Sequence, residues 1–315
     1  MDNRTPYFDA PADEAVPVDV FIVGAMKAGT SNIQDRLSDH PSVYFPYLKE
    51  PNYFLFEGGC PEFTGPGDEK INRLAVKGLD AYRDLYKRAP DGAVRGDAST
   101  TYLFDPDVAE RIAARRPDAK IVILLRNPID RAYSAFNHLR RDGREPLDDF
   151  EQALEAEDER AELGWEPLWR YLAGSMYAAQ VEQYLEHFPR GAMYIDFFEH
   201  LVVSEEEVLR GLCRFLNINA EVLGTSAIPR NASGIPTNPR LRRALSAETP
   251  WRLKVKRAFP KAIRDVVVRV RDRSMIKPPP LDRDVRDQLR NRLATDVTAL
   301  SDLLEGEPHR WWVDF

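Results

Sequence analysis

The chain has 315 residues, of which 43% are hydrophobic and 10% aromatic, so it can bury a sizeable core in one large or two ordinary domains. A net charge of −7 with 30% charged residues is typical of a soluble protein and excludes a general nucleic-acid binder. Two cysteines are too few for a secreted disulfide scaffold and favour a reducing compartment. Residues 1–18 lack the pattern of a signal peptide, and no apolar run is long enough to span a membrane, so we expect a cytoplasmic protein.

The N-terminal part of the chain predicts a strand, a loop and a helix in direct succession. Residues 18–23 are apolar enough for a buried strand, 24–30 form a turn, and 31–37 form a helix. That helix ends before Pro41, because the residue before a proline leaves the α region. The next elements expected are a short strand at 42–45 and a loop rich in Gly and Pro at 60–67.

The clearest strand is 120–125, which is apolar without alternation, as expected when helices cover both faces of a parallel sheet. Pro128 suits the first turn of a helix that runs to about residue 140. The other predicted elements are strands at 93–96 and 192–196 and helices at 106–116, 148–161, 175–187, 205–216 and 282–305. Strands that alternate with helices predict an α/β fold with a central parallel sheet flanked by helices on both faces.

The loop after the first strand is a variant of the Walker phosphate loop, whose pattern is G-x-x-x-x-G-K-[ST] between a strand and a helix. Gly24 and Gly29 hold the glycine positions, which allows backbone N–H groups to point at phosphate oxygens, and Ser31 holds the hydroxyl position. Thr30 stands where the Walker lysine belongs, and the lysine is Lys27 instead. The sequence therefore predicts a P-loop-like anion cradle at a helix N-terminus, which its lysine approaches from another point.

The end of the 120–125 strand departs from nucleoside-triphosphate enzymes, which usually have an Asp there to hold Mg²⁺. This chain has Arg126 at that place. A cation attracts phosphate and repels magnesium, so the site argues against ATP hydrolysis and phosphoryl transfer. A transferred sulfuryl group carries less negative charge and has less need of a metal clamp. The five histidines and two cysteines show no metal-ligand spacing, so we predict no metal.

Three motifs in this order resemble the sulfotransferases that use 3′-phosphoadenosine 5′-phosphosulfate (PAPS). They are Lys27-Ala28-Gly29-Thr30-Ser31, Lys49-Glu50-Pro51-Asn52-Tyr53-Phe54, and Leu125-Arg126-Asn127-Pro128-Ile129-Asp130-Arg131-Ala132-Tyr133-Ser134. The sequence looks most like the branch of heparan sulfate sulfotransferases and their bacterial relatives. The resemblance implies one sulfotransferase domain over 1–315, with an N-terminal extension at 1–17 and a basic insertion at 240–280 before the last helix.

The resemblance implies that the first and third motifs bind PAPS. Lys27 would stabilise charge on the leaving phosphate, and the 5′-phosphate would be bound by Ala28, Gly29, Thr30 and Ser31. Arg126 and Ser134 match the pair that holds the 3′-phosphate, since arginine offers a fork of donors and serine a hydroxyl. From the residues alone, the alternatives are a solvated loop lysine, a helix N-cap at Ser31, an ion pair of Arg126 with Asp130, and a helix-packing serine.

Glu50 matches the general base of the family, which would take the proton from the acceptor hydroxyl. The alternative is a solvated Lys49–Glu50 pair in a loop, and Lys49 would oppose a raised pKa of the glutamate unless it points elsewhere. Family members often have His where this chain has Asn52, and some glycan-directed members have Lys near the position of Ala98. The full catalytic set of those members is therefore not carried over to this chain.

Aromatic and hydroxyl side chains near the motifs are candidates for binding. Tyr177 stands where a contact with the cosubstrate is expected, since aromatic rings can stack on sugars and on adenine. The residues expected to line the acceptor site are Asn52, Tyr53, Thr100, Tyr102 and Trp169. For Trp169 and Tyr177, core packing is the alternative interpretation, and for Thr100 and Tyr102 it is a loop at a strand end.

Residues 230–234 are the candidate for the loop that closes the cosubstrate site, with Asn231 and Gly234 as contacts. The stretch 240–277 carries thirteen Lys or Arg and three acidic residues. It could attract PAPS, an anionic acceptor or a membrane surface in a peripheral contact, and a solvated basic helix pair is the alternative.

Together these features predict transfer of a sulfuryl group from PAPS to a hydroxyl of a small-molecule or carbohydrate acceptor. The transfer would be an in-line displacement that releases adenosine 3′,5′-bisphosphate. One rival is a kinase-like nucleotide-dependent phosphotransferase, which Arg126 and the displaced lysine disfavour. The other is a non-catalytic nucleotide-binding protein, which the presence of Glu50 disfavours.

Overall fold

The computed structural model describes residues 15–57, 59, 62–223 and 278–312. It also describes the backbone of two short paired strands, β6 (Ile235–Pro236) and β7 (Met275–Ile276). Asn231, Gly234 and nearly all of 240–277 lie outside the described residues, as do residues 1–14. The single domain over 1–315, its N-terminal extension and its basic insertion therefore stay predictions.

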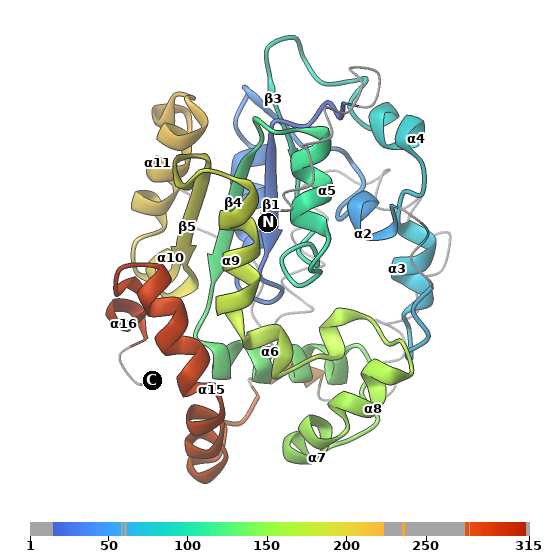
Figure 1. Cartoon of the computed structure of the whole chain (residues 1–315), viewed down its shortest axis with the longest axis vertical. Helices are drawn as coiled ribbons and strands as arrows, with labels where there is room; N and C mark the ends of the chain where they lie inside the picture. The colour runs from blue at the N-terminus through green and yellow to red at the C-terminus, as the bar shows by residue number, and fades with distance from the viewer. Residues whose placement is uncertain are drawn as a thin grey trace, which may run out of the picture.

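A five-stranded parallel sheet forms the centre of the protein, with the strand order β2-β3-β1-β4-β5 (Figure 1). The strands are β1 (Val20–Gly24), β2 (Val43–Tyr44), β3 (Val94–Asp97), β4 (Lys120–Leu125) and β5 (Met193–Phe197). Each of the five predicted strands is present, and β4 begins and ends at the predicted residues. The prediction of an α/β fold with a central parallel sheet is confirmed.

Helices cover both faces of the sheet, because alternate side chains of each buried strand point to opposite sides. On one face, Phe21 and Ile123 belong to a core that includes α5 (Val108–Arg115) and α9 (Tyr177–His187), both in front of the sheet in Figure 1. On the other face, Ile22 lies in the core formed with α1 (Thr30–Ser38) and α11 (Glu205–Leu216).

The helix α6 (Pro128–Arg141) follows β4 directly and runs across the edge of the sheet where the strands end (Figure 1). Asn127 caps it, since its side-chain oxygen accepts the N–H groups of Ile129 and Asp130 at 3.1 and 3.3 Å. The buried side of α6 packs on α7 (Phe150–Glu155) and on the first turns of α15 (Arg283–Leu303). In open α/β sheets, this edge is where ligands bind, at the point where the strand order reverses. Here β1 lies between β3 and β4, so that point is the end of β1.

The predicted helix at 148–161 is wrong in one respect, because it is two helices, α7 and α8 (Glu157–Glu162). The two helices meet at Ala156, which stays in the right-handed helical region but with ψ −2°, and the buried Glu157 carboxylate accepts the N–H groups of Leu172 and Ala173 at 2.7 and 2.9 Å. Among the described residues, five α-helices were not predicted: α2 (Tyr53–Phe56), α3 (Glu69–Leu74), α4 (Leu79–Asp84), α10 (Phe198–Val203) and α16 (Glu307–Trp311). In the described part of the chain, no helix has both the length and the apolarity needed to cross a bilayer.

Candidate active site

The loop between β1 and α1 requires both of its glycines. A Cβ at position 24 would lie 2.5 Å from the Cβ of Leu103, and one at position 29 would lie 2.8 Å from the ring of Phe198. Gly29 also has φ +91°, a conformation that side chains with a Cβ rarely adopt. It is the N-cap of α1 and offers no side-chain acceptor, so the first N–H groups of the helix have no side-chain cap. The predicted strand, loop and helix are therefore present, in a form that suits an anion.

Lys27 stands in the middle of this loop, half-buried and with φ +70°. Burial lowers the pKa of its ammonium to about 8, and the charges of Arg141 and Arg126 add to that effect, whereas Asp142 and Glu50 oppose it. The ammonium is thus a poorly solvated cation among other cations. An anion at this site would relieve that cost, which is the electrostatic setting of an anion-binding lysine.

Arg126 extends from the end of β4 to the phosphate loop. Its Nη1 donates to the backbone oxygen of Lys27 at 3.1 Å, and its guanidinium lies 4.5 Å from the centre of the Phe198 ring. Its buried Nε has no hydrogen-bond partner among the described residues, and burial lowers its pKa. Arg126 and Asp130 are not in ion-pair contact, since Asp130 pairs with Arg286 at 2.5 Å, but the charge of Asp130 still raises the pKa of Arg126. An unused buried donor on a cation is what an anionic ligand would satisfy.

Ser134 lies on α6, eight residues after Arg126, and is half-buried. Within the described ranges, its hydroxyl makes no hydrogen bond, unlike Ser175, which bonds to Arg131 and to two carbonyl oxygens. Together with the Nε of Arg126, it gives this edge of the sheet two unused donors, which fit a bound phosphate group.

Glu50 has φ +53° and stands in a turn that three side chains hold in place. Its Oε1 accepts the hydroxyl of Thr100 at 3.1 Å, and its backbone oxygen accepts the amide of Asn52 at 3.1 Å. Asn52 in turn accepts the hydroxyl of Thr101 at 2.8 Å, and its N–H donates to Ser99 at 3.0 Å. Asn52 therefore orients Glu50, and strained non-glycine residues held this firmly are typical of active sites.

Lys49 points away from its neighbour Glu50, because its ammonium donates to the hydroxyl of Ser31 at 2.7 Å. The second motif thus contributes a cation to the phosphate loop and a carboxylate to the end of β3. The charge of Glu50 is the smallest of the named influences on the pKa of Lys27, which it raises.

Three aromatic residues predicted to line the acceptor site lie in the core instead. Tyr53 and Tyr102 are 4% and 0% exposed, and Trp169 is 0% exposed. Their polar atoms are also used, since Tyr53 donates to Glu57 at 2.9 Å, Tyr102 to Asp97 at 3.3 Å, and Trp169 to Asp68 at 3.1 Å. For these three, core packing is the correct interpretation, because no ring surface is free for a ligand.

Tyr177 is likewise fully buried, and its hydroxyl donates to the backbone oxygen of Arg126 at 3.1 Å. Tyr177 therefore holds the backbone of Arg126 from within the core, and core packing is the correct interpretation for its ring. Phe198 and Glu199 on α10, Arg141 and Asp142 were not predicted to belong to the site. A signal for the first two was available, because they directly follow a strand end of a parallel sheet. No local sequence pattern identifies Arg141 and Asp142, which lie at the end of the long helix α6.

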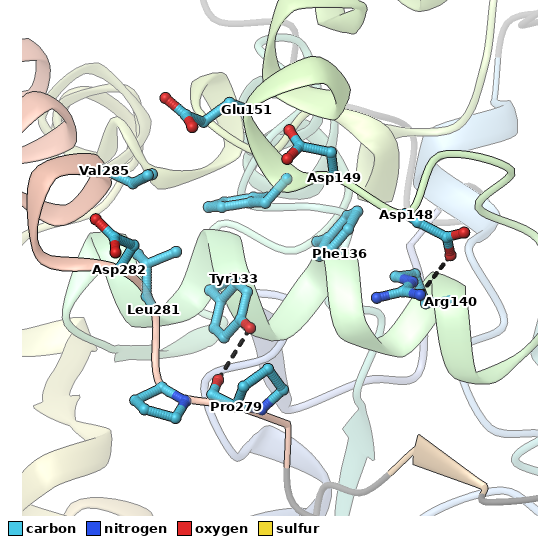
Figure 2. Close-up of a pocket in the computed structure, with 12 residues that line it drawn as sticks. Tyr133, Phe136, Arg140, Asp148, Asp149, Glu151, Pro279, Leu281, Asp282 and Val285 are labelled. Atoms are coloured by element: carbon cyan, nitrogen blue, oxygen red, sulfur yellow. Dashed lines mark hydrogen bonds and ion pairs between the residues drawn. The ribbon is translucent and has the colours of Figure 1, made fainter.

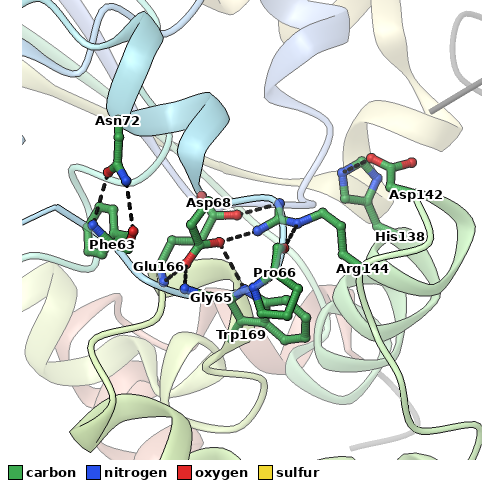
Figure 3. Close-up of polar contacts among 10 residues, drawn as sticks. All are labelled: Phe63, Gly65, Pro66, Asp68, Asn72, His138, Asp142, Arg144, Glu166 and Trp169. Carbon is green, nitrogen blue, oxygen red and sulfur yellow. Dashed lines mark hydrogen bonds and ion pairs between the residues drawn. The ribbon is translucent and has the colours of Figure 1, made fainter. Parts of the chain in front are cut away.

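Asp68 and Glu166 form a buried carboxylate pair around Arg144 (Figure 3). Asp68 is 0% exposed, accepts the N–H groups of Gly65 and Glu166 at 2.8 Å each, and pairs with Arg144, whose Nη1 lies 2.6 Å from a carboxylate oxygen of Glu166. Burial raises the pKa of Glu166 to about 7. This network joins the 62–68 and 163–169 segments to the end of α6, close to His138. Burial and the charge of Lys27 lower the pKa of His138 well below its usual value.

The cavity in Figure 2 is separate from these residues. It has a volume of about 220 Å³ and lies between α6 and the start of α15, lined by Tyr133, Phe136, Phe150, Leu281 and Val285 among others. The hydroxyl of Tyr133 donates to the oxygen of Pro279 at 2.9 Å, which closes one side. No predicted site residue lines it. Among the described residues, no three His, Cys, Asp or Glu side chains are grouped as around a metal ion.

Comparison with known proteins agrees with this geometry. Residues 17–221 match the model of the sulfotransferase family. The chain is 27% identical over 268 residues to mouse heparan sulfate glucosamine 3-O-sulfotransferase 3B1, covering 84% of this chain and 62% of that protein. It is 29% identical over 240 residues to mouse bifunctional heparan sulfate N-deacetylase/N-sulfotransferase 2, covering 69% of this chain but 25% of that protein.

A solved structure is similar over nearly the whole chain. It is a sulfotransferase from Alicyclobacillus acidocaldarius, 33% identical, with a TM-score of 0.73, covering 92% of this chain and 97% of the other. The resemblance to heparan sulfate sulfotransferases and to a bacterial relative is therefore confirmed in sequence and in fold. The chain belongs to the sulfotransferase family.

Proposed function

We propose that this sulfotransferase moves the sulfuryl group of PAPS to a hydroxyl of a carbohydrate or small-molecule acceptor. The observation that carries the proposal is Arg126, a cation at the strand end where a magnesium-binding acid would stand, with an unused Nε and a hydrogen bond to the phosphate loop. A site made of two cations and a helix N-terminus suits a donor with two phosphate groups better than a metal-bound triphosphate.

Each residue has a distinct role in this proposal. Arg126 and Ser134 hold the 3′-phosphate, and the loop from Ala28 to Ser31 holds the 5′-phosphate through its N–H and hydroxyl groups. Lys27 stabilises the charge that develops on the 5′-phosphate oxygen as its bond to sulfur breaks. Because burial costs the ammonium its solvation, this interaction is stronger than it would be in water.

Glu50 acts as the general base. Thr100 engages its Oε1, and no described residue hydrogen-bonds its Oε2, which leaves that oxygen to accept the proton of the acceptor hydroxyl. The new bond forms between the acceptor oxygen and sulfur, on the side opposite the leaving phosphate. The products are a sulfate ester and adenosine 3′,5′-bisphosphate.

The acceptor class is proposed from the relatives, whose names assign them to heparan sulfate glucosamine. A heparan-type oligosaccharide is therefore the first acceptor to test, with a simple phenol for the small-molecule class. A cytoplasmic location and a peripheral membrane contact through 240–277 stay predictions from the sequence.

The proposed base is tested with Glu50→Gln, which keeps the size of the side chain and its hydrogen bond from Thr100. We expect binding of adenosine 3′,5′-bisphosphate to persist and turnover of PAPS with acceptor to fall ~100-fold or more, as for loss of a general base. Turnover equal to that of the unsubstituted protein would exclude Glu50 as the base. The matched control is Glu57→Gln, on a carboxylate that bonds to Tyr53 and Arg115 and serves the core.

A further inference from the structure

The peptide group between Arg126 and Asn127 is held at both of its polar atoms. Its oxygen accepts the hydroxyl of Tyr177 at 3.1 Å, and its N–H donates to Oε1 of Glu199 at 3.0 Å. Asn127 is also fixed on the far side, because its side chain caps α6. The backbone that carries the Arg126 side chain therefore has almost no freedom to rotate.

Trp312 connects the two groups that hold this peptide. Its indole N–H donates to Oε2 of Glu199 at 3.1 Å, and its ring lies 6.1 Å from the ring of Tyr177. It also packs edge-on against Phe197 at 5.5 Å and is only 2% exposed. One side chain, directly after α16, thus contacts both the donor and the acceptor that fix the Arg126–Asn127 peptide.

The same C-terminal part of the chain fixes the backbone of Tyr177. The carboxylate of Asp296, on α15, accepts the N–H groups of Tyr177 and Ala178 at 2.7 and 3.1 Å, which caps the N-terminus of α9. Both the ring and the backbone of Tyr177 therefore depend on residues from the end of the chain.

The orientation of Arg126 affects the phosphate loop as well. Its guanidinium donates to the oxygen of Lys27 and lies on Phe198, whose ring fills the space that a Cβ at Gly29 would need. A change at the Arg126–Asn127 peptide would move this guanidinium relative to the loop.

We propose that Trp312 is a positioning residue for the cosubstrate site, acting through Glu199 and Tyr177 on the Arg126–Asn127 peptide. It sets the direction in which Arg126 presents its free donors to the 3′-phosphate. The C-terminal end of the chain is in this way part of the recognition of the donor. This inference rests on the proposed function, which assigns the 3′-phosphate to Arg126.

The test measures selectivity for the 3′-phosphate in the full chain. Dissociation constants are determined for adenosine 3′,5′-bisphosphate by calorimetry and for adenosine 5′-phosphate by competition. The selectivity ratio is the dissociation constant of adenosine 5′-phosphate divided by that of adenosine 3′,5′-bisphosphate. Trp312→Phe removes the indole N–H but keeps an aromatic ring. We expect this ratio to fall by about threefold to tenfold, the factor that one hydrogen bond commonly contributes, because affinity for adenosine 3′,5′-bisphosphate falls by more than affinity for adenosine 5′-phosphate.

The neighbouring tryptophan gives a matched control. Trp311 stacks on His200 at 4.4 Å and takes no part in holding the Arg126–Asn127 peptide. Trp311→Phe should leave the ratio at the value of the unsubstituted protein. An equal fall in both variants would mean that the substitution only disturbs the C-terminal helix, and would overturn the proposal.

A second variant removes the hydrogen bond to the oxygen of the same peptide group. Tyr177→Phe removes the hydroxyl that bonds to the oxygen of Arg126, and it should also lower the ratio by about threefold to tenfold. In the double variant the loss should be smaller than the product of the two single losses, because both act on one peptide group. If Trp312→Phe does not fold, as judged by its melting curve, an unchanged ratio in Tyr177→Phe alone overturns the proposal.

Failure of this inference is distinct from failure of the proposed function. If the unsubstituted protein does not prefer adenosine 3′,5′-bisphosphate over adenosine 5′-phosphate, the 3′-phosphate assignment of Arg126 is wrong. If it has that preference and Trp312→Phe keeps it in full, the assignment stands and the role of Trp312 is refuted.

Discussion

Affinity for adenosine 3′,5′-bisphosphate should depend on pH above neutrality because of Lys27. Burial and neighbouring cations lower the pKa of this ammonium to about 8 in the free protein. A bound phosphate would favour the charged form and raise that pKa again, so binding takes up a proton when the pH exceeds the free pKa. The affinity must then fall as the pH rises through about 8.

The size of this effect follows from the pKa. With a pKa of about 8, ~90% of Lys27 is charged at pH 7 and ~3% at pH 9.5, so the affinity should fall by up to ~30-fold over that range. The phosphates of the ligand, with a second pKa near 6, are already about 90% ionised at pH 7 and add little to the change. In Lys27→Arg the guanidinium stays charged, so its affinity should remain nearly constant over the same range.

The assay is calorimetric titration at constant ionic strength in steps from pH 7 to pH 9.5, on the unsubstituted protein and on Lys27→Arg. Lys49→Arg is the matched control, since Lys49 also contacts the loop, through Ser31, but is exposed. It should keep the pH dependence of the unsubstituted protein. A fall of less than threefold in the unsubstituted protein, or an equal fall in Lys27→Arg, would refute the assignment of Lys27 to the anion.

Three further substitutions test other parts of the site. Arg126→Ala should weaken binding of adenosine 3′,5′-bisphosphate about 100-fold, since one or two charge-assisted hydrogen bonds of ~1.5–3 kcal/mol are lost. Binding of adenosine 5′-phosphate should weaken less than tenfold, and equal losses by calorimetry would exclude the 3′-phosphate role. Asn52→Ala should lower kcat about tenfold with KM for PAPS nearly constant, because the turn that carries Glu50 loses the hydrogen bond from the Asn52 side-chain amide to the Glu50 backbone oxygen. Steady-state kinetics with an unchanged kcat would contradict this. Gly29→Ala should lower the free energy of unfolding by about 2–4 kcal/mol, through its φ of +91° and the contact with Phe198, and an unchanged denaturant midpoint would count against that packing.

The sheet could be predicted from the sequence because its strands have simple patterns. The strand at 120–125 contains an unbroken apolar run, 121–125, which ends at Arg126, and α11 also has its predicted bounds. Short helices could not be predicted, since tertiary contacts decide them. The four residues of α2 are an example: all are buried, in a segment that the sequence marks only as part of a motif.

The site residues on strand ends were predictable for a physical reason. The carboxyl ends of parallel strands meet at one edge, so Lys27 after β1 and Arg126 after β4 had to lie close together. Their hydrogen bond, from Nη1 of Arg126 to the oxygen of Lys27, fits that expectation.

The aromatic residues show where residue type alone fails. Tyr102 and Trp169 occur near the motifs, but an aromatic ring in a loop serves the core as readily as a ligand, and both are fully buried. Trp312 could not be predicted either. It donates a hydrogen bond to Glu199, 113 residues earlier in the sequence, and no local pattern predicts such a contact.

The most direct test of the account is transfer of the labelled sulfuryl group of PAPS in the presence of EDTA. The chain is incubated with PAPS carrying ³⁵S and with either a heparan-type oligosaccharide or a simple phenol. We expect label on one of these acceptors and an equal amount of adenosine 3′,5′-bisphosphate, with the product lost in Glu50→Gln. A protein that leaves PAPS intact with every acceptor, or that instead phosphorylates them with ATP and Mg²⁺, would contradict sulfuryl transfer from PAPS.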